Sequence, residues 1–446
     1  MAIFILTVFA VLAVGSIVRP QWALALLLLM YPLEQAMQGS VYYLRSHVSM
    51  TNFAVAAIVF ASTLLGFARG TINLSGYFNR IWVLVACAYL YSLFSVLWTP
   101  SRGTAFILLD AGYPYVGMYI VVAPLFVQRL SEWRNVLMIT TIFGLLIAVA
   151  ILFTPDFTLK GGRLGFDFGG GEKSRSSPLA IGELGGFLML SGALFVVEGR
   201  KNWMLALRIA ALIAGTVLSI YSGSRGQFIF AALLAIVFFP ISRPIRDLRQ
   251  FVFFAAAAIG FMVVIAVVLS ILLGDQDVVA RWFSGAKTED ALEVRSANAT
   301  ELLHAYARSP SSWLTGLGLN AFTSITGSAH EPYTHSMFVD VLAEMGLVAF
   351  AFLCYWLWTV ARQSIELVKG CTQFADDRSA AALLVALCCY QILLMNKQGE
   401  LWTSEHTVVY FLLLAKIAAD TINFGGDSVD DVEHDGEGPV AEGQAD

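Results

Sequence analysis

Long apolar stretches, separated by short polar ones, run through almost the whole chain. Most of them carry few or no charged residues, and the stretch 251–273 has 23 residues without a charge. About 20 consecutive apolar residues make a helix long enough to cross the hydrocarbon core of a membrane. The pattern therefore predicts an all-α polytopic membrane protein. The predicted helices cover residues 2–18, 22–32, 53–67, 81–98, 112–127, 135–153, 179–197, 203–220, 228–240, 251–273, 336–358, 381–395 and 406–419.

The predicted number of transmembrane helices is 12 or 13, because the first two stretches form either a tight hairpin around Arg19 and Pro20 or a single element. The amino-acid composition also indicates a membrane protein. Hydrophobic residues make up 58% of the chain and charged residues only 13%, about half of the roughly 25% usual in soluble proteins. A soluble core of this size cannot bury so many apolar side chains, so a secreted or cytosolic globular enzyme is excluded.

Basic residues concentrate in alternate connections between the predicted helices, and loops of this kind usually face the cytoplasm. This set contains Arg19, Arg69, Arg80, Arg129, Arg134, Arg200, Lys201, Arg243, Arg246, Arg249, Arg362, Lys369 and Arg378. The opposite connections, including 154–178 and 274–334, are then external. The loop 274–334 is long enough to have its own structure or function. Within it, residues 291–307 are predicted to form a helix, because apolar residues recur at helical spacing and Pro310 follows.

Residues 420–446 differ from the rest of the chain. They hold nine acidic residues and no Lys or Arg, in a protein whose net charge is −5. An acidic, Gly-rich segment with few large apolar residues is predicted to be disordered. We therefore divide the chain into a transmembrane helical bundle, 1–419, which includes the loop 274–334, and an acidic disordered cytoplasmic tail, 420–446.

The external turn 221–227 is the strongest candidate for chemistry. Ser222 and Ser224 are predicted to cap the following helix, whose first amides favour an anion. Arg225 adds a planar donor that binds phosphate in a bidentate manner, and Gly226 follows it. The alternative interpretation is a tight turn whose Arg225 pairs with lipid headgroups.

The predicted loop helix carries a second candidate, Arg295. It shares a helix face with Leu292 and Leu302, so it is expected to point toward the bundle, where an Arg needs an anionic partner. The alternative is a local ion pair with Glu289 or Glu301.

His335 and Ser336 open the predicted helix 336–358 on the external side. A His at this place is a candidate proton acceptor near neutral pH, and an ordinary interfacial His is the alternative. Asp340 and Glu344 lie about 140° and 180° from His335 around the helix, so neither can orient its ring directly. Together with Glu183 and Arg208, these two acids are also charges in or near apolar stretches, which are functional by default.

In chain order, four features resemble the O-antigen ligase and polymerase superfamily of bacterial inner-membrane proteins, the Wzy/WaaL type. They are the Ser224-Arg225-Gly226 turn before a membrane helix, the large external loop with Arg295, the stretch 309–322 with its Gly-x-Gly-Leu sequence, and His335-Ser336 followed by Gly346 and the small residue Ala349. The family often has Gly where this chain has Ala349. The resemblance covers about residues 220–350, and the remainder is similar only in its hydropathy.

The resemblance implies a helical membrane glycosyltransferase with a GT-C-like fold, in the bacterial inner membrane and with its active site facing the periplasm. It implies a glycan on undecaprenyl diphosphate as donor, no cofactor and no metal. Arg225 and Arg295 would hold the diphosphate, His335 would activate the acceptor hydroxyl, and direct displacement would invert the anomeric centre. Ser222, Ser224, Gly226 and Ser336 would support them. Membrane lipids surround such a protein, a chain-length regulator is a further expected partner, and no nucleic acid is expected.

Two acceptors agree with this chemistry. The leading interpretation is a polymerase for O-antigen or exopolysaccharide, which extends another lipid-linked oligosaccharide. The alternative is a ligase that transfers the glycan to lipid A–core in lipopolysaccharide synthesis. A transporter or flippase of lipid-linked sugar is the second alternative, although it would favour charges and broken helices deep in the membrane. The sugar, its linkage, the oligomeric state and the partner of His335 stay open.

Overall fold

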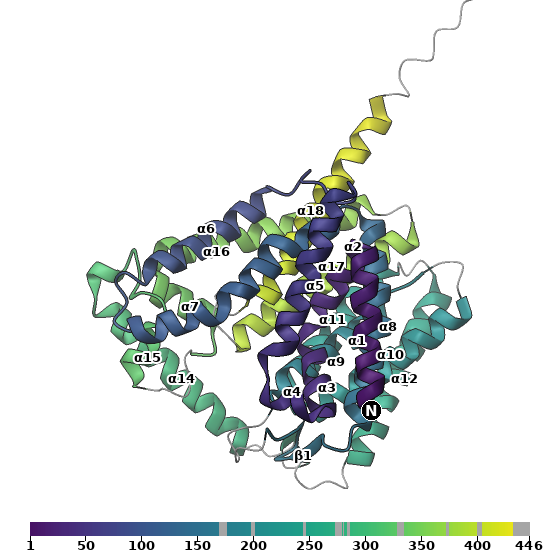
Figure 1. Ribbon diagram of the computed structural model, residues 1–446, viewed down its shortest axis with the longest axis horizontal. Coiled ribbons are helices and arrows are strands. Elements are labelled where there is room, and N and C mark those ends of the chain that lie inside the picture. Colours follow the sequence, from purple (N-terminus) through teal and green to yellow (C-terminus); the bar gives the residue numbers. More distant parts are fainter. Residues whose placement is uncertain are drawn as a thin grey trace, which may run out of the picture.

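The computed structural model describes residues 1–168, 176–197, 201–243, 247–272, 279, 281–282, 286–327, 334–371, 374–398 and 404–430. Within these residues the chain is almost entirely helical (Figure 1), which confirms the predicted all-α class. The α-helices are α1 (Ala2–Val18), α2 (Pro20–Leu28), α3 (Met30–Ser40), α4 (Tyr42–Ser46), α5 (Ser49–Ala68), α6 (Arg80–Ser95), α7 (Arg102–Val116), α8 (Leu130–Phe153), α9 (Pro178–Leu194), α10 (Lys201–Tyr221), α11 (Arg225–Ser242), α12 (Leu248–Leu272), α14 (Ala286–Ala307), α15 (Ala321–Thr326), α16 (Met337–Gly370), α17 (Ala375–Gln398) and α18 (Glu405–Asp430). The π-helix η1 (Gly117–Val122) and the 3-10 helices η2 (Ala123–Phe126) and η3 (Pro310–Ser312) complete the helical part.

Seven helices of the described residues are long and apolar enough to cross a membrane, and three shorter helices are also apolar. This confirms a polytopic membrane protein, while the total of 12 or 13 crossings stays a prediction. The predicted hairpin at Arg19 is present, because α1 ends there, Pro20 opens α2 and the two helices pack together. Among the seven, α17 is the most enclosed: 78% of its apolar window is buried, against 33% for α11. It therefore lies at the centre of the bundle.

Two contacts join predicted basic connections at one end of the bundle. Arg69 Nη1 donates to the carbonyl of Ile17 (2.7 Å), where α1 ends, and Arg378 Nε donates to the carbonyl of Ile241 (2.6 Å), near the end of α11. At the opposite end lie the N-terminus and β1, whereas α18 leaves the bundle at the basic end (Figure 1). These contacts agree with the expected alternation, and which end faces the cytoplasm stays a prediction.

Three local features of the structure bear on the sequence predictions. The loop helix predicted at 291–307 is confirmed and begins earlier, as α14. The loop 154–178 contains a two-stranded antiparallel sheet that was not predicted, with β1 (Thr158–Lys160) paired to β2 (Arg163–Gly165). The helix α18 extends as far as residue 430, and the disorder of the tail stays a prediction. Residues 431–446 lie outside the described part of the chain.

Candidate functional site

The turn between α10 and α11 is built differently from the prediction. Ser222 Oγ donates to the carbonyl of Ser219 (2.8 Å) and accepts from the amide of Ser224 (3.2 Å), so it closes the end of α10. Ser224 precedes Arg225 as the N-cap residue of α11, but its side chain makes no cap hydrogen bond. The prediction that these two serines cap α11 is therefore wrong. Ser224 Oγ instead accepts from Lys397 Nζ at 3.0 Å.

Lys397 lies in the last turn of α17, and sequence reasoning missed it. Its side chain passes directly over Gly226: a Cβ at that position would lie 2.7 Å from Lys397 Nζ and 2.8 Å from Cδ. Real Cβ atoms do not approach other heavy atoms so closely. Gly226 therefore allows the ammonium group to reach the turn that carries Arg225, and this is its supporting role in the structure.

Lys397 belongs to a group of five basic side chains, which we call the cation cluster. Its members are Arg163 on β2, Arg225 on α11, Arg281, Arg295 on α14, and Lys397. The charges of all four arginines act on the Lys397 ammonium group, that of Arg295 most strongly. The cluster thus draws on five segments that are far apart in the sequence, and it includes both arginines that the sequence singled out.

Arg281 also contacts the turn that carries Arg225. Its Nε donates to the carbonyl of Gly223 at 2.9 Å, and the neighbouring Trp282 indole donates to the carbonyl of Ile220 at 3.3 Å. Burial, together with the nearby charges of Arg163 and Arg225, lowers the pKa of Arg281 to about 10. The guanidinium is therefore still charged at neutral pH, and it stays among other cations.

His335 lies directly before Ser336, the N-cap residue of α16. The residue after it, Ser336, donates from Oγ to Asn396 Oδ1 at 3.2 Å, and Asn396 directly precedes Lys397 in the last turn of α17. The end of α17 therefore joins the two sequence motifs, because Asn396 contacts the His335 segment and Lys397 contacts the Arg225 turn.

His335 has a φ of +64°, in the left-handed region. Such a conformation is unfavourable for a residue with a Cβ and persists where the surroundings enforce it. Asp340 supplies part of this support: its Oδ1 accepts from the hydroxyl (2.7 Å) and the amide (3.3 Å) of Thr334. Asp340 thus holds Thr334, the residue before His335, through both its hydroxyl and its amide.

One structural feature explains why glycine occupies positions 316, 318 and 346, which belong to the motifs of the family resemblance. α16 is broken at Gly346, whose φ of 81° and ψ of 178° are non-helical. The loop 313–318 enters this break: the amides of Leu317 and Gly318 donate to the carbonyls of Ala343 and Glu344 (2.9 and 2.8 Å), and Leu347 N donates back to the loop at Trp313 (2.8 Å). The Gly-x-Gly sequence and the glycine of α16 therefore form one joint.

Glu344 strengthens the same joint. Its two carboxylate oxygens accept from the amides of Asn320 (2.9 Å) and Phe322 (3.0 Å), at the beginning of α15. Phe322 packs in one apolar cluster with Leu302 of α14. The charge of Glu344 inside the apolar stretch thus has a structural role, and it fixes the helix that carries Arg295 against α16.

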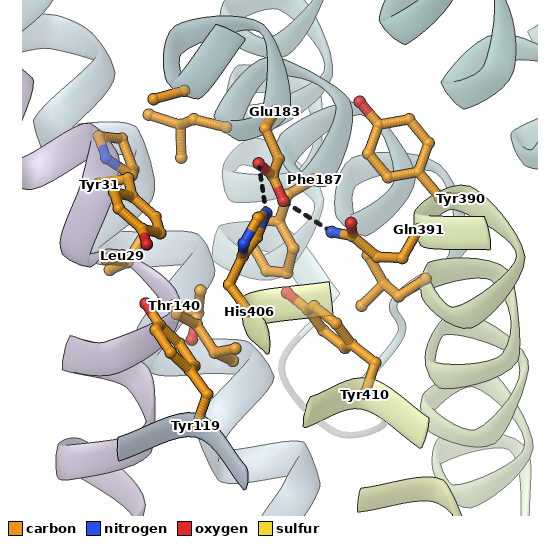
Figure 2. Close-up of a pocket in the computed structure, with 15 residues that line it drawn as sticks. Leu29, Tyr31, Tyr119, Thr140, Glu183, Phe187, Tyr390, Gln391, His406 and Tyr410 are labelled. Atoms are coloured by element: carbon orange, nitrogen blue, oxygen red, sulfur yellow. Dashed lines mark hydrogen bonds and ion pairs between the residues drawn. The ribbon is translucent and has the colours of Figure 1, made fainter. Parts of the chain in front are cut away.

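A second polar group lies inside the bundle, in a cavity of about 30 Å³ that has room for about two water molecules. Figure 2 shows Glu183 of α9 between His406 and Gln391: Nε2 of His406 lies 3.6 Å from one carboxylate oxygen, and Gln391 donates to the other at 2.7 Å. Tyr31 donates to the neighbouring Glu405 at 3.2 Å. The predicted intramembrane charge of Glu183 is therefore paired, and the pair joins α9, α17 and α18.

Arg208, on α10, donates to the carbonyls of Gly192 and Ala193, both at 3.1 Å, at the C-terminal end of α9. It satisfies carbonyls at the end of the helix, so its role is structural as well. Among the described residues, no three His, Cys, Asp or Glu side chains come close enough to hold a metal ion. Metal independence itself stays a prediction.

Residues 209–354 match the sequence model of a family described as O-antigen ligase. The matched segment begins in α10 and ends in α16, so it contains Arg225, Arg295, His335 and the Gly346 joint. It agrees with the region on which the expected resemblance rests, and it confirms the resemblance to the O-antigen ligase and polymerase superfamily. No curated protein matches the chain. Lys397 lies outside the matched segment.

Proposed function

Because the chain carries an O-antigen ligase domain at residues 209–354, we propose that it is a membrane glycosyltransferase of this superfamily. It transfers a glycan from undecaprenyl diphosphate to a sugar hydroxyl at the periplasmic face of the bacterial inner membrane. One observation carries this proposal: Asn396 and Lys397, adjacent in α17, connect the His335 segment with the Arg225 turn. A candidate base and a group of cations therefore lie side by side.

The proposed binding of the donor depends on the positive charge of the cation cluster. Glycan transfer at the periplasmic face has no nucleotide sugar or ATP to drive it, so the donor brings its own leaving group. Negative charge develops on the diphosphate as its bond to the sugar breaks, and preorganised cations stabilise this charge. Each charged hydrogen bond contributes about 1.5–3 kcal/mol. Arg225 and Arg295, in the cation cluster, are the residues that bind the diphosphate.

The acceptor side rests on His335. A sugar hydroxyl is a poor nucleophile, and a His that accepts its proton contributes about 10²–10⁴-fold in rate. The left-handed backbone of His335 and the bond from Ser336 to Asn396 hold the ring segment in place. The acceptor oxygen attacks the anomeric carbon opposite the diphosphate, so the reaction inverts this centre and needs neither metal nor cofactor. An NMR assignment showing the donor's anomeric configuration in the product would refute this mechanism.

Polymerase and ligase differ in the acceptor alone. We retain the polymerase, with another lipid-linked oligosaccharide as acceptor and a chain-length regulator as partner, as the leading form of the proposal. The ligase, with lipid A–core as acceptor, is the alternative, and the printed description of the matched family favours it. Both use the same donor site and the same base.

A transporter of lipid-linked sugar is a second candidate function, and one observation favours it. The half-buried Glu183–His406 pair shares its cavity with residues from two helix breaks, Leu29 between α2 and α3, and Tyr119 in the π-helix η1. Breaks of this kind often mark functional sites, and transporters place them beside internal charges. The cation cluster and His335 at one end of the bundle have no comparable explanation in a transporter.

The experiment supplies the reconstituted protein with undecaprenyl-diphosphate-linked repeat units from its host. A ladder of products without lipid A–core identifies a polymerase, and a product that requires lipid A–core identifies a ligase. His304→Ala, an exposed histidine of α14, is the control for His335→Ala, which is expected to give no product. Movement of the lipid across the bilayer without any product would replace the proposal with the transporter.

A further inference from the structure

Lys397, like Arg163, is a basic residue of the cation cluster that lies outside the segment matched by the family model. We propose that Lys397 is a further diphosphate-binding residue, and that it binds the phosphate from which the glycan departs. This inference rests on the proposed function and deepens it: it assigns one cation to the oxygen on which the new negative charge appears.

The position of Lys397 between donor and acceptor sides carries the inference. Its chain neighbour Asn396 bonds to Ser336, the residue after the candidate base, while its own ammonium group bonds to Ser224, the residue before Arg225. In a direct displacement, the base, the acceptor oxygen, the anomeric carbon and the leaving oxygen follow one another at about 2–3 Å, so base and leaving oxygen are about 8 Å apart. Asn396 and Lys397, with Cα atoms about 3.8 Å apart, contact the segment of the base and the turn of Arg225 respectively, which suits a separation of this order.

The electrostatics of the cluster points to an anion. Four arginine charges act on Lys397, and like charges so close together disfavour one another. A helix C-terminus attracts a Lys, which is the structural explanation for a basic residue at the end of α17. That explanation accounts for neither the contact with Ser224 nor the absence of a side chain at Gly226 beneath the ammonium group. A site that collects cations at this cost is suited to a ligand with several negative charges.

The chemistry gives Lys397 a distinct role. In the donor, each of the two phosphates carries one negative charge. A bond forms between the acceptor oxygen and the anomeric carbon, the bond from this carbon to the phosphate oxygen breaks, and the electron pair stays on the phosphate. The hydroxyl proton passes to His335. The terminal phosphate of the product then carries about 1.5–2 negative charges at neutral pH, so a cation beside it binds the transition state and the product more strongly than the donor.

The test replaces Lys397 by Met, which keeps the length of the side chain and removes its charge. Lys369→Met, an exposed lysine at the opposite end of the bundle, is the matched control. The loss of one charged hydrogen bond in the transition state corresponds to about a 10- to 100-fold lower kcat, with a small change in KM. Lys397→Arg is expected to recover part of the rate. A kcat for Lys397→Met equal to that of the control would overturn the inference.

Gly226→Ala gives a second test, which separates a role of Lys397 in binding diphosphate from a purely structural role of this lysine. The new Cβ displaces the Lys397 ammonium group without removing its charge, so kcat is expected to fall as well. In the Lys397→Met background the same substitution is expected to have little further effect, because the two changes disturb one contact. Fully additive effects would contradict a shared contact.

A binding measurement separates failure of the inference from failure of the proposed function. Farnesyl diphosphate and farnesyl monophosphate are titrated into the reconstituted wild type and Lys397→Met. We expect the substitution to weaken the diphosphate about tenfold or more, and the monophosphate less. If the wild type transfers no glycan but this difference remains, the diphosphate site stands and the proposed reaction is wrong. If the wild type and Lys397→Met bind farnesyl diphosphate with the same affinity, and likewise the monophosphate, Lys397 is not a diphosphate-binding residue.

Discussion

The joint between α16 and the loop 313–318 gives the sharpest test of how the site is held together. Gly346 has a φ of 81° and a ψ of 178°, a region that essentially only glycine adopts, so Ala there costs about 1–3 kcal/mol in backbone strain. Its Cβ would also lie 2.4 Å from the carbonyl oxygen of Leu314 and 2.5 Å from the amide nitrogen of Gly316. Because both are backbone atoms, Gly346→Ala has to displace the loop.

The displaced loop loses the three backbone hydrogen bonds donated by the amides of Leu317, Gly318 and Leu347. At about 0.5–1.5 kcal/mol each, they bring the expected loss of local stability to roughly 3–7 kcal/mol. Hydrogen exchange by mass spectrometry reports this directly, since 3 kcal/mol corresponds to about 150-fold faster exchange. Peptides that contain these amides are expected to exchange faster by at least this factor.

Gly327→Ala is the matched control. Gly327 also has a positive φ, of 64°, but nothing lies within 4 Å of a Cβ at this position. The substitution carries the left-handed penalty of about 1–2 kcal/mol and no clash. If exchange at Leu317, Gly318 and Leu347 in Gly346→Ala is no faster than in Gly327→Ala, the loop does not depend on close approach at Gly346, and the reasoning fails.

Three further predictions concern stability and orientation. Glu344→Gln removes the charge that holds the amides of Asn320 and Phe322, and it is expected to lower stability by about 1.5–3 kcal/mol per weakened hydrogen bond. Thermal unfolding in detergent measures this loss, with Glu301→Gln at an exposed position as the control. Equal unfolding midpoints for the two variants would contradict the prediction. Glu183→Gln and His406→Gln each break the half-buried pair at 3.6 Å and are expected to lose about 1–3 kcal/mol. The double variant is expected to lose clearly less than their sum, and additive losses would show that the pair is not coupled. In a cysteine-free background, a membrane-impermeant maleimide is expected to label Lys160→Cys in intact spheroplasts and Lys369→Cys only after permeabilisation, and the reverse pattern would invert the proposed orientation.

The sequence predicted what is local in the bundle. Apolar stretches gave helices such as α8 and α10 within a few residues, because a helix surrounded by lipid needs little more than length and hydropathy. It missed what depends on distant partners. Nothing near Gly346 indicates that the loop 313–318 enters α16, so the stretch 336–358 reads as one continuous helix.

Lys397 was missed for a similar reason. The apolar stretch 381–395 ends before it, and its partner Ser224 lies 173 residues away in the sequence. A signal was nevertheless present, since a Lys directly after a predicted helix is unusual on the side where basic residues are scarce. The hairpin of β1 and β2 also had a local signal in its two-residue turn, Gly161-Gly162.

The rate of glycan transfer by site variants tests the central claim most directly. The measurement is the initial rate at which radiolabelled glycan leaves undecaprenyl diphosphate for an acceptor in proteoliposomes, with wild type beside Arg225→Ala, Arg295→Ala and His335→Ala. Arg308→Ala and His304→Ala, at exposed positions in and just after α14, are the controls. The account predicts wild-type rates in the controls and a loss of at least 100-fold in each site variant. Equal rates in Arg225→Ala and Arg308→Ala would contradict a diphosphate site at the cation cluster.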